Sequence, residues 1–193
     1  KDLEQKETFA DMKIGSIVGL MLIYFILAWV FKSWSRPLTI MIMIPFAFIG
    51  AVLGHYILGL TMSILSMFAL LALAGIVVNN SIILVSTIER RFDDLLNDTE
   101  NSLKDQNIIN EAIISGVVDR LRPVLLTSLT TIGGLSALMF EKSLQAQFLI
   151  PMAATIVFGL GVTAFLVLII VPSMMGINND LSNFIKSLKE GNR

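Results

Sequence analysis

The uncharged stretch at residues 37–88 constrains the fold of this chain most, because 52 consecutive residues include no Asp, Glu, Lys or Arg. A transmembrane helix needs about 20 apolar residues at a rise of 1.5 Å per residue. As one helix this stretch would be about 78 Å long, far more than one bilayer crossing requires. It therefore predicts two membrane spans joined by a turn. We expect the turn at residues 58–63, where Gly59 ends one helix and Thr61 or Ser63 caps the next.

Three other apolar runs raise the number of expected spans to five. The composition agrees, because 55% of the residues are hydrophobic and 15% are charged, against about 25% charged residues in soluble domains. Pro123 is expected in the first turn of the fourth span, and Pro45 and Pro151 predict kinks inside spans. We therefore predict an all-α membrane protein with five transmembrane helices in a membrane domain at residues 14–172. The spans are expected at about residues 14–31, 38–58, 62–87, 123–140 and 148–171.

Lys and Arg are distributed unevenly between the two sides of these spans. One side carries ten of them, in the loops at 32–36 and 89–122 and in the tail at 173–193, and the other side carries four. Since cytoplasmic loops are enriched in Lys and Arg, we expect a periplasmic N-terminus and a cytoplasmic C-terminus. Residues 1–13 then form a periplasmic lead-in, 89–122 a cytoplasmic amphipathic connection and 173–193 a cytoplasmic tail. The polar start without a signal peptide predicts that the sequence is a piece of a longer chain.

Several kinds of chemistry have no residues to support them. The chain has no cysteine and one histidine, His55, so disulfides and thiolate metal sites are excluded and a histidine metal site would depend on carboxylates. No phosphate-binding loop, nucleophile with its base, or carboxylate pair lies within the spans. We expect no enzyme activity, no catalytic residue, no metal site and no cofactor. The net charge of −1 gives no reason to expect a nucleic-acid partner, and His55 is expected at the membrane interface.

Two adjacent asparagines, Asn79 and Asn80, interrupt the apolar third span (GIVVNNSIILV). At 100° per residue they share one side of the helix with small and hydroxyl-bearing residues. The fourth and fifth spans carry similar stripes. The members of the three stripes are Ala69, Ala72, Gly75, Asn79, Asn80, Ser86 and Thr87; Thr127, Thr130, Thr131, Gly134 and Ala137; and Thr155, Gly159 and Thr163.

These stripes have two interpretations. Small residues allow close helix approach, and hydroxyls can bond across it, so we expect helix packing at Ala72, Gly75, Thr131, Gly134, Thr155 and Gly159. The asparagine pair favours a second role, because an unpaired amide in an apolar medium costs about 2 to 7 kcal/mol and two neighbouring amides need separate partners. Buried polar groups in membranes often mark ion pathways. A water-accessible relay or a charged partner on another helix is the second interpretation, and both stay open.

Four segments, taken together, resemble the resistance-nodulation-division (RND) superfamily, closest to its hydrophobe/amphiphile efflux branch. They follow one another in the order and spacing typical of that superfamily and cover nearly the whole chain, and the most specific is the RLRPVLLTSLTT entry to the fourth span. By this resemblance the five spans are the last five of twelve, and residues 1–13 lead out of the second periplasmic porter region. The segments are FKSWSRPLTIMIMIPFAFIGAVLGHYILGL, GIVVNNSIILV, EAIISGVVDRLRPVLLTSLTTIGGL and SLQAQFLIPMAATIVFGLG.

The resemblance implies proton-driven export of small amphiphilic compounds from the bacterial inner membrane. The family's relay centres on a carboxylate pair in its fourth span, which would lie outside this chain, faced by a lysine and an asparagine in the tenth span and a threonine in the eleventh. Asn80 matches the asparagine and Thr127 the threonine, whereas Asn79 stands where drug pumps keep the lysine. Asn79, Asn80 and Thr127 are therefore the expected proton-relay residues. A neutral amide contributes no compensating charge, so the lysine-based switch does not carry over, and the coupling ion or stoichiometry is left open.

The implied partners are the rest of the parent chain, with its acidic pair and porter domains, two further copies in a homotrimer, a periplasmic adaptor, an outer-membrane channel and the lipid bilayer. Two rival functions remain. One is an RND relative that moves lipids or assists protein export, which the missing lysine favours. The other is a non-transporting membrane scaffold in which the polar stripes only pack helices. The substrate-selecting domains would lie outside these residues.

Overall fold

The computed structural model describes residues 2–98 and 106–190, and the chain divides into two compact units, residues 1–41 and 42–193. Helices account for nearly all of the described residues, and no strand is found among them. Five segments are long and apolar enough to cross a membrane, which confirms the expected all-α, five-span class. These segments are Ala10–Phe31, Ser35–Leu58, Ile64–Leu96, Ile108–Met139 and Leu144–Leu181.

The first unit contains α1 (Asp2–Phe31) and the short α2 (Ser35–Met41). The turn between them places Lys32 in the left-handed region at φ 47°, and the Arg36 guanidinium donates a hydrogen bond to the Phe31 carbonyl at 3.1 Å. This bond satisfies one of the carbonyls left open at the end of α1. Most large apolar side chains of α1 are exposed, with Trp29 86% exposed, as on a helix whose surroundings are lipid or other spans.

The second predicted span is divided into two helical segments. Helix α2 ends at Met41 and α3 (Met43–Leu58) begins after a turn at Ile42. Pro45 explains the break, because it has no N–H to donate to the Met41 carbonyl four residues earlier. Pro123 was expected at a helix start, and that prediction is wrong. The preceding amphipathic segment is helical too, so Pro123 lies inside α5 (Gln106–Met139).

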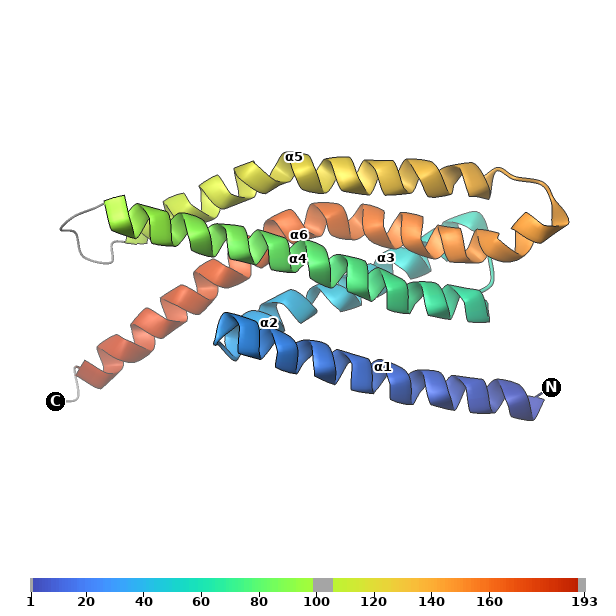
Figure 1. The fold of residues 1–193 in the computed structure, drawn as a ribbon, viewed down its shortest axis with the longest axis horizontal. Helices are drawn as coiled ribbons and strands as arrows, with labels where there is room; N and C mark the ends of the chain where they lie inside the picture. The colour runs from blue at the N-terminus through green and yellow to red at the C-terminus, as the bar shows by residue number, and fades with distance from the viewer. Residues whose placement is uncertain (1, 99–105, 191–193) are drawn as a thin grey trace. The chain divides into compact units, whose positions relative to one another are not determined.

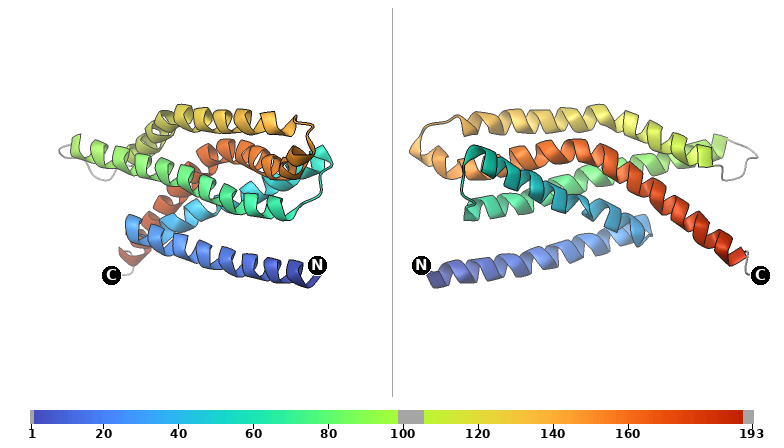
Figure 2. Two further views of the ribbon diagram at one scale, coloured as in Figure 1. Left: turned by 45° about the vertical axis from the view of Figure 1, so that its right-hand side comes forward. Right: turned by 180° about the vertical axis from the view of Figure 1, so that it is seen from behind.

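The second unit consists of α3, α4 (Ile64–Asp98), α5 and α6 (Leu144–Glu190). Helix α6 packs against each of the other three, and α4 also packs against α3 and α5. Figure 1 shows α4 and α5 antiparallel, and Figures 1 and 2 show both beside α6. Figure 1 also shows α5 and α6 changing direction along their length; Pro123 lies inside α5 and Pro151 and Pro172 inside α6, as expected for proline in a helix.

The turn between α3 and α4 forms where the sequence predicts it. Gly59 adopts φ 64°, its N–H donates to the Tyr56 carbonyl at 3.3 Å, and the Leu60 N–H donates to the His55 carbonyl at 2.9 Å. These two bonds close the end of α3 in a left-handed cap that glycine adopts without strain. Ser63, and not Thr61, caps α4, since its hydroxyl accepts the Ser66 N–H at 3.2 Å.

Glycines bring α6 into close contact with α3 and α4. A Cβ at Gly50 would lie 2.9 Å from Val162 Cβ, 3.0 Å from the Phe158 carbonyl oxygen and 3.1 Å from Gly159 Cα. A Cβ at Gly54 would overlap the Phe158 side chain, and one at Gly159 would overlap Leu73. The three helices therefore approach at a distance that only glycine permits at these positions. The core around them includes Ala47, Ala51, Leu73, Val77 and Leu160.

This packing predicts that Gly50→Ala destabilises the protein. The added methyl group would meet backbone atoms of α6, and over-packing of this kind costs about 1 to 3 kcal/mol. The matched control is Gly161→Ala, where the new Cβ would meet only Ile132 Cδ1 at 3.8 Å, an ordinary contact. Detergent-induced unfolding of the intact protein, followed by helical circular dichroism, should show a loss for Gly50→Ala alone, and equal stability of the two variants would contradict this packing.

Candidate functional site on α4 and α5

The asparagine pair lies in the middle of α4, on a side that the described helices of the second unit leave at least partly exposed. Asn79 is exposed and Asn80 half-buried, and Ala72 and Gly75 on the same side are also exposed. No hydrogen bond of either asparagine side chain is found within residues 2–98 and 106–190. The side of α4 opposite Asn79 is apolar and buried, and the half-buried Asn80 lies at the edge of that side, so the Asn79 amide in particular is free to meet groups from elsewhere. The buried residues of that side include Leu73, Val77, Leu84, Val85 and Ile88.

Helix α5 also turns its threonine side away from the packed core. Thr127 is exposed, and its hydroxyl donates to the carbonyls of Pro123 at 2.9 Å and Val124 at 3.1 Å in its own helix. Thr131 is half-buried, and its hydroxyl donates to the Thr127 carbonyl at 2.9 Å. Each hydroxyl oxygen keeps lone pairs that can accept a hydrogen bond from outside the helix. A methyl group added at Gly134 would have no atom of another described helix within 4 Å.

The six residues expected to pack helices divide into two groups. Thr155 and Gly159 are buried in α6, where Gly159 lies against Leu73 of α4 and the Ala47 carbonyl of α3, and the Thr155 hydroxyl donates to the Pro151 carbonyl at 2.8 Å. Ala72, Gly75 and Gly134 are exposed and Thr131 is half-buried. Their part in helix packing stays a prediction about segments that this chain does not contain.

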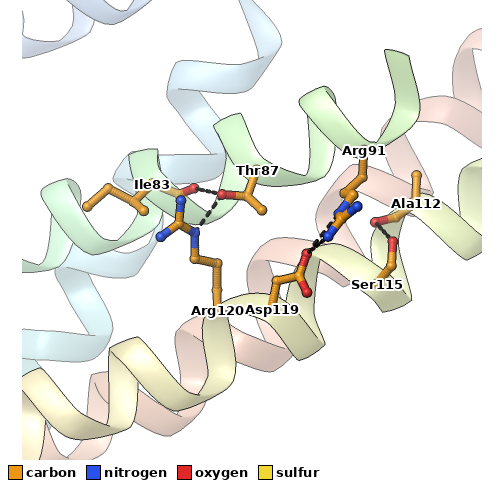
Figure 3. Close-up of polar contacts among 7 residues, drawn as sticks. All are labelled: Ile83, Thr87, Arg91, Ala112, Ser115, Asp119 and Arg120. Carbon is orange, nitrogen blue, oxygen red and sulfur yellow. Dashed lines mark hydrogen bonds and ion pairs between the residues drawn. The ribbon is translucent and has the colours of Figure 1, made fainter. Parts of the chain in front are cut away.

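Two polar cross-links join α4 to α5 beside this uncovered side (Figure 3). Arg120 Nε donates to Thr87 Oγ1 at 2.6 Å, and Arg91 binds Asp119 Oδ2 through Nε at 2.8 Å and through Nη2 at 2.6 Å. The helices are close here, because a Cβ at Gly116 of α5 would lie 2.7 Å from Ile88 Cγ1 and 3.0 Å from Ile88 Cα. Sequence reasoning treated Arg120 only as a loop charge. Its position close before Pro123, at the entry to an apolar run, was the available signal.

The Arg120–Thr87 bond also shows how far along the two helices Asn80 and Thr127 lie relative to each other. Asn80 lies seven residues before Thr87, and Thr127 lies seven residues after Arg120. Seven residues advance a helix by about 10 Å and return to within about 20° of the same side. Because α4 and α5 are antiparallel neighbours, Asn80 and Thr127 lie at about the same level along the two helices. The structure thus places two of the three expected relay residues on adjacent helices at matching heights.

The site contains hydrogen-bonding groups but no charge of its own. Neither residues 64–88 nor residues 123–139 include an Asp, Glu, Lys, Arg or His. Amides and hydroxyls donate and accept hydrogen bonds without changing charge near neutral pH, so a proton-binding group would have to come from other segments. Within the described part of the chain, no cluster of three or more His, Cys, Asp or Glu residues could hold a metal ion.

Fold and site define an all-α, multi-pass membrane protein whose neighbouring helices present polar sides. The family model described as the AcrB/AcrD/AcrF family matches residues 2–177. The chain belongs to this family, and so to the RND superfamily of transporters that its motifs resemble.

The names of similar proteins refer to motility, to multidrug resistance and to metal resistance. The swarming motility protein SwrC of Bacillus subtilis is 32% identical over 168 residues, which cover 86% of this chain and 15% of that protein. The multidrug resistance protein MdtC of Proteus mirabilis is 30% identical over 170 residues, which cover 86% of this chain and 15% of MdtC. The nickel and cobalt resistance protein CnrA of Cupriavidus metallidurans is 28% identical over 145 residues, which cover 75% of this chain and 12% of CnrA.

A crystal structure of a heavy metal efflux pump has a similar fold, with a TM-score of 0.76 at 25% identity. The match covers 90% of this chain and 16% of the pump. The chain therefore spans about 15% of the length of the relatives it matches.

The cross-link at Thr87 predicts that Thr87→Val costs about 1 to 3 kcal/mol of unfolding free energy, because a half-buried guanidinium loses its hydrogen-bond acceptor. Ser86→Ala is the matched control, since the Ser86 hydroxyl donates only within its own helix, to the Ile83 carbonyl at 3.0 Å. Its effect should stay within about 0.5 kcal/mol. Detergent-induced unfolding of the intact protein compares the two, and equal losses would show that the bond contributes nothing.

Proposed function

We propose that this chain is the C-terminal membrane part of an efflux permease of the bacterial inner membrane, driven by the proton-motive force. The observation that carries the proposal is the uncovered polar side shared by α4 and α5, with Asn80 and Thr127 at matching heights beside the Arg120–Thr87 bond. Polar side chains in a membrane require partners. The partners proposed here are carboxylates on spans of the intact protein outside residues 1–193.

In this mechanism Asn79 and Asn80 donate hydrogen bonds to a carboxylate when it is deprotonated, directly or through water, and Thr127 takes part from α5. When the carboxylate binds a proton, it becomes neutral and accepts hydrogen bonds from these donors more weakly. The helices can then rearrange. A lysine at position 79 would supply a compensating positive charge, whereas Asn79 supplies only a dipole. The deprotonated site therefore carries one more negative charge than the same site in a lysine-containing pump.

The proposed substrates are small amphiphilic compounds, a choice supported by the name of MdtC. Export of divalent metal ions is a second candidate, supported by the name of CnrA and by the fold of the heavy metal pump. Resistance of a deletion strain complemented with the intact protein, tested against amphiphilic dyes and against nickel and cobalt salts, distinguishes the two. The proposed assembly is a homotrimer with porter domains, a periplasmic adaptor and an outer-membrane channel.

The relay role predicts that Asn79→Leu in the intact protein abolishes export while expression and membrane insertion stay normal. Leucine has a similar size but cannot hydrogen-bond a carboxylate. Asn110→Leu, the same change at an exposed position near the start of α5, is the control and should keep export. Dye efflux from energised cells, together with quenching of a ΔpH probe in vesicles, measures both. Unchanged proton-coupled export in Asn79→Leu would exclude the relay role and favour a packing role for the stripe.

The proposed orientation has its own test. Residues 1–193 contain no cysteine, so single cysteines can be introduced after any others in the intact protein are replaced. Cysteine at position 142, in the exposed α5–α6 connection, should react with a membrane-impermeant maleimide in cells with a permeable outer membrane. Cysteine at position 93, exposed in the last turns of α4, should react only after the inner membrane is opened. The reverse pattern would invert the proposed topology.

A further inference from the structure

The single histidine of the chain, His55, which is expected at the membrane interface, is buried between helices of the second unit. His55 is 3% exposed in the last turn of α3. The elements packed against α3 within its unit are α4 and α6, and they contain no titratable residue before Glu89 and Asp180, respectively. On α3 itself the other titratable group is Tyr56, which is 84% exposed. His55 thus stands apart from every charged group of the segments described around it.

Both imidazole nitrogens of His55 have hydrogen-bond partners. Nδ1 lies 3.0 Å from the Ala51 carbonyl oxygen, and Nε2 lies 3.0 Å from the hydroxyl oxygen of Ser66, which is fully buried. A carbonyl can only accept, so Nδ1 carries a hydrogen whatever the charge of the ring. The Ser66 hydroxyl also accepts the Ser63 N–H at 3.2 Å and lies 3.2 Å from the Ser63 hydroxyl. Three side chains therefore form one continuous chain from the turn to the imidazole.

Counting hydrogens fixes the directions of these bonds for neutral His55. Nε2 then has only a lone pair, so the Ser66 O–H donates to it. The two lone pairs of Ser66 Oγ accept the Ser63 N–H and the Ser63 O–H. Ser63 Oγ accepts the Ser66 N–H at 3.2 Å, which is the cap of α4. Every donor among these groups has an acceptor.

The same positions also suit the charged ring. With a hydrogen on Nε2, the imidazolium donates to Ser66 Oγ, and the Ser66 O–H turns to donate to Ser63 Oγ. The backbone bonds of the cap persist, and only the Ser63 O–H has to find a new acceptor. Ser63 is half-buried, so it can reach solvent from the turn. The last turn of α3 also favours a cation, because the helix dipole is negative there.

We propose that His55, Ser66 and Ser63 form a proton-binding site, in which the two hydroxyls load a proton from the turn onto the buried imidazole. An incoming proton binds Ser63 Oγ, the former Ser63 hydrogen moves to Ser66 Oγ, and the former Ser66 hydrogen moves to Nε2. Both serines end as neutral hydroxyls and the ring ends as imidazolium, which is the charged pattern derived above. Because Nδ1–H is held by the Ala51 carbonyl, the site stores the proton and does not pass it on.

This site is distinct from the asparagine pair. Ser66 and Asn79 are 13 residues apart on α4, which is about 20 Å along the helix axis. Binding of a proton at His55 does not depend on export by the intact protein.

The test is infrared difference spectroscopy of the intact protein during a pH titration. Subtracting the spectra of His55→Gln from those of the wild type isolates the imidazolium ring band of this residue. We expect that band to grow as the pH is lowered from 9 to 4. In Ser66→Ala the ring loses its partner at Nε2 in both states, and the bond of the charged ring is the stronger of the two, so the pH of half-titration should fall by about 1 unit. Thr61→Ala, which removes an exposed hydroxyl of the same turn, should leave the titration unchanged.

Two variants of Ser63 test the same site if Ser66→Ala does not fold. Ser63→Ala removes the acceptor that the Ser66 O–H needs in the charged state, so it should lower the half-titration pH and slow proton uptake after a pH jump. Ser63→Thr keeps a hydroxyl and a good helix cap, and it should restore both values. Identical spectra of the wild type and His55→Gln from pH 4 to 9 would overturn the site. A titration insensitive to loss of either hydroxyl would overturn the loading path.

Discussion

Helices inside a bilayer gain little from hydrophobic association, because lipid tails are as apolar as leucine, and close packing has to hold them together. In the second unit this packing centres on glycines of α3 and α6. Gly50 and Gly54 of α3 leave room for the α6 backbone and side chains around Phe158. Gly159 of α6 leaves room for Leu73 of α4 and the Ala47 carbonyl of α3. The apolar side of α4 is used in this contact, since Leu73 is fully buried there. Helix α4 therefore cannot rotate to hide its asparagines without losing its contact with α6.

The uncovered polar side follows from this packing. With Leu73, Val77 and Leu84 buried, the amide of Asn79 lies on exposed surface, and the antiparallel neighbour α5 exposes Thr127. The Arg120–Thr87 bond and the Ile88–Gly116 contact hold the two helices in register close to this surface. If this surface faced lipid, each amide or hydroxyl group without a hydrogen-bond partner would cost several kcal/mol. Such a surface is stable only where other spans or water meet it.

Sequence periodicity and turn chemistry predicted the five spans and the turn at Gly59, because each rests on local rules of length, hydropathy and backbone conformation. The error at Pro123 arose where two local rules competed. Pro123 has the features of a helix start, but the amphipathic segment before it continues the same helix, and a proline inside a long helix is tolerated in membranes. The burial of His55 depends on a partner, Ser66, which lies eleven residues away across a turn. Arg120 was missed because its acceptor, Thr87, lies 33 residues away on another helix. The partners proposed for the asparagines lie outside these residues, so their role cannot be read from local rules.

The two polar regions of α4 are separated by a stretch that cannot carry protons. Residues 67–78 consist only of Met, Phe, Ala, Leu, Gly, Ile and Val, so no side chain between Ser66 and Asn79 can donate or accept a hydrogen bond of ordinary strength. Any coupling between the proton-binding site at His55 and the asparagine pair along this helix must therefore be mechanical. Ser66, Leu73 and Asn80 follow one another at intervals of seven residues and so lie on one side of α4. Leu73, the middle member, packs on Gly159 of α6. Closely packed contacts tend to shift as a unit rather than deform continuously. A displacement of the α3–α4 turn would therefore be transmitted along α4 to Asn80, with the Leu73–Gly159 contact as the point that has to move.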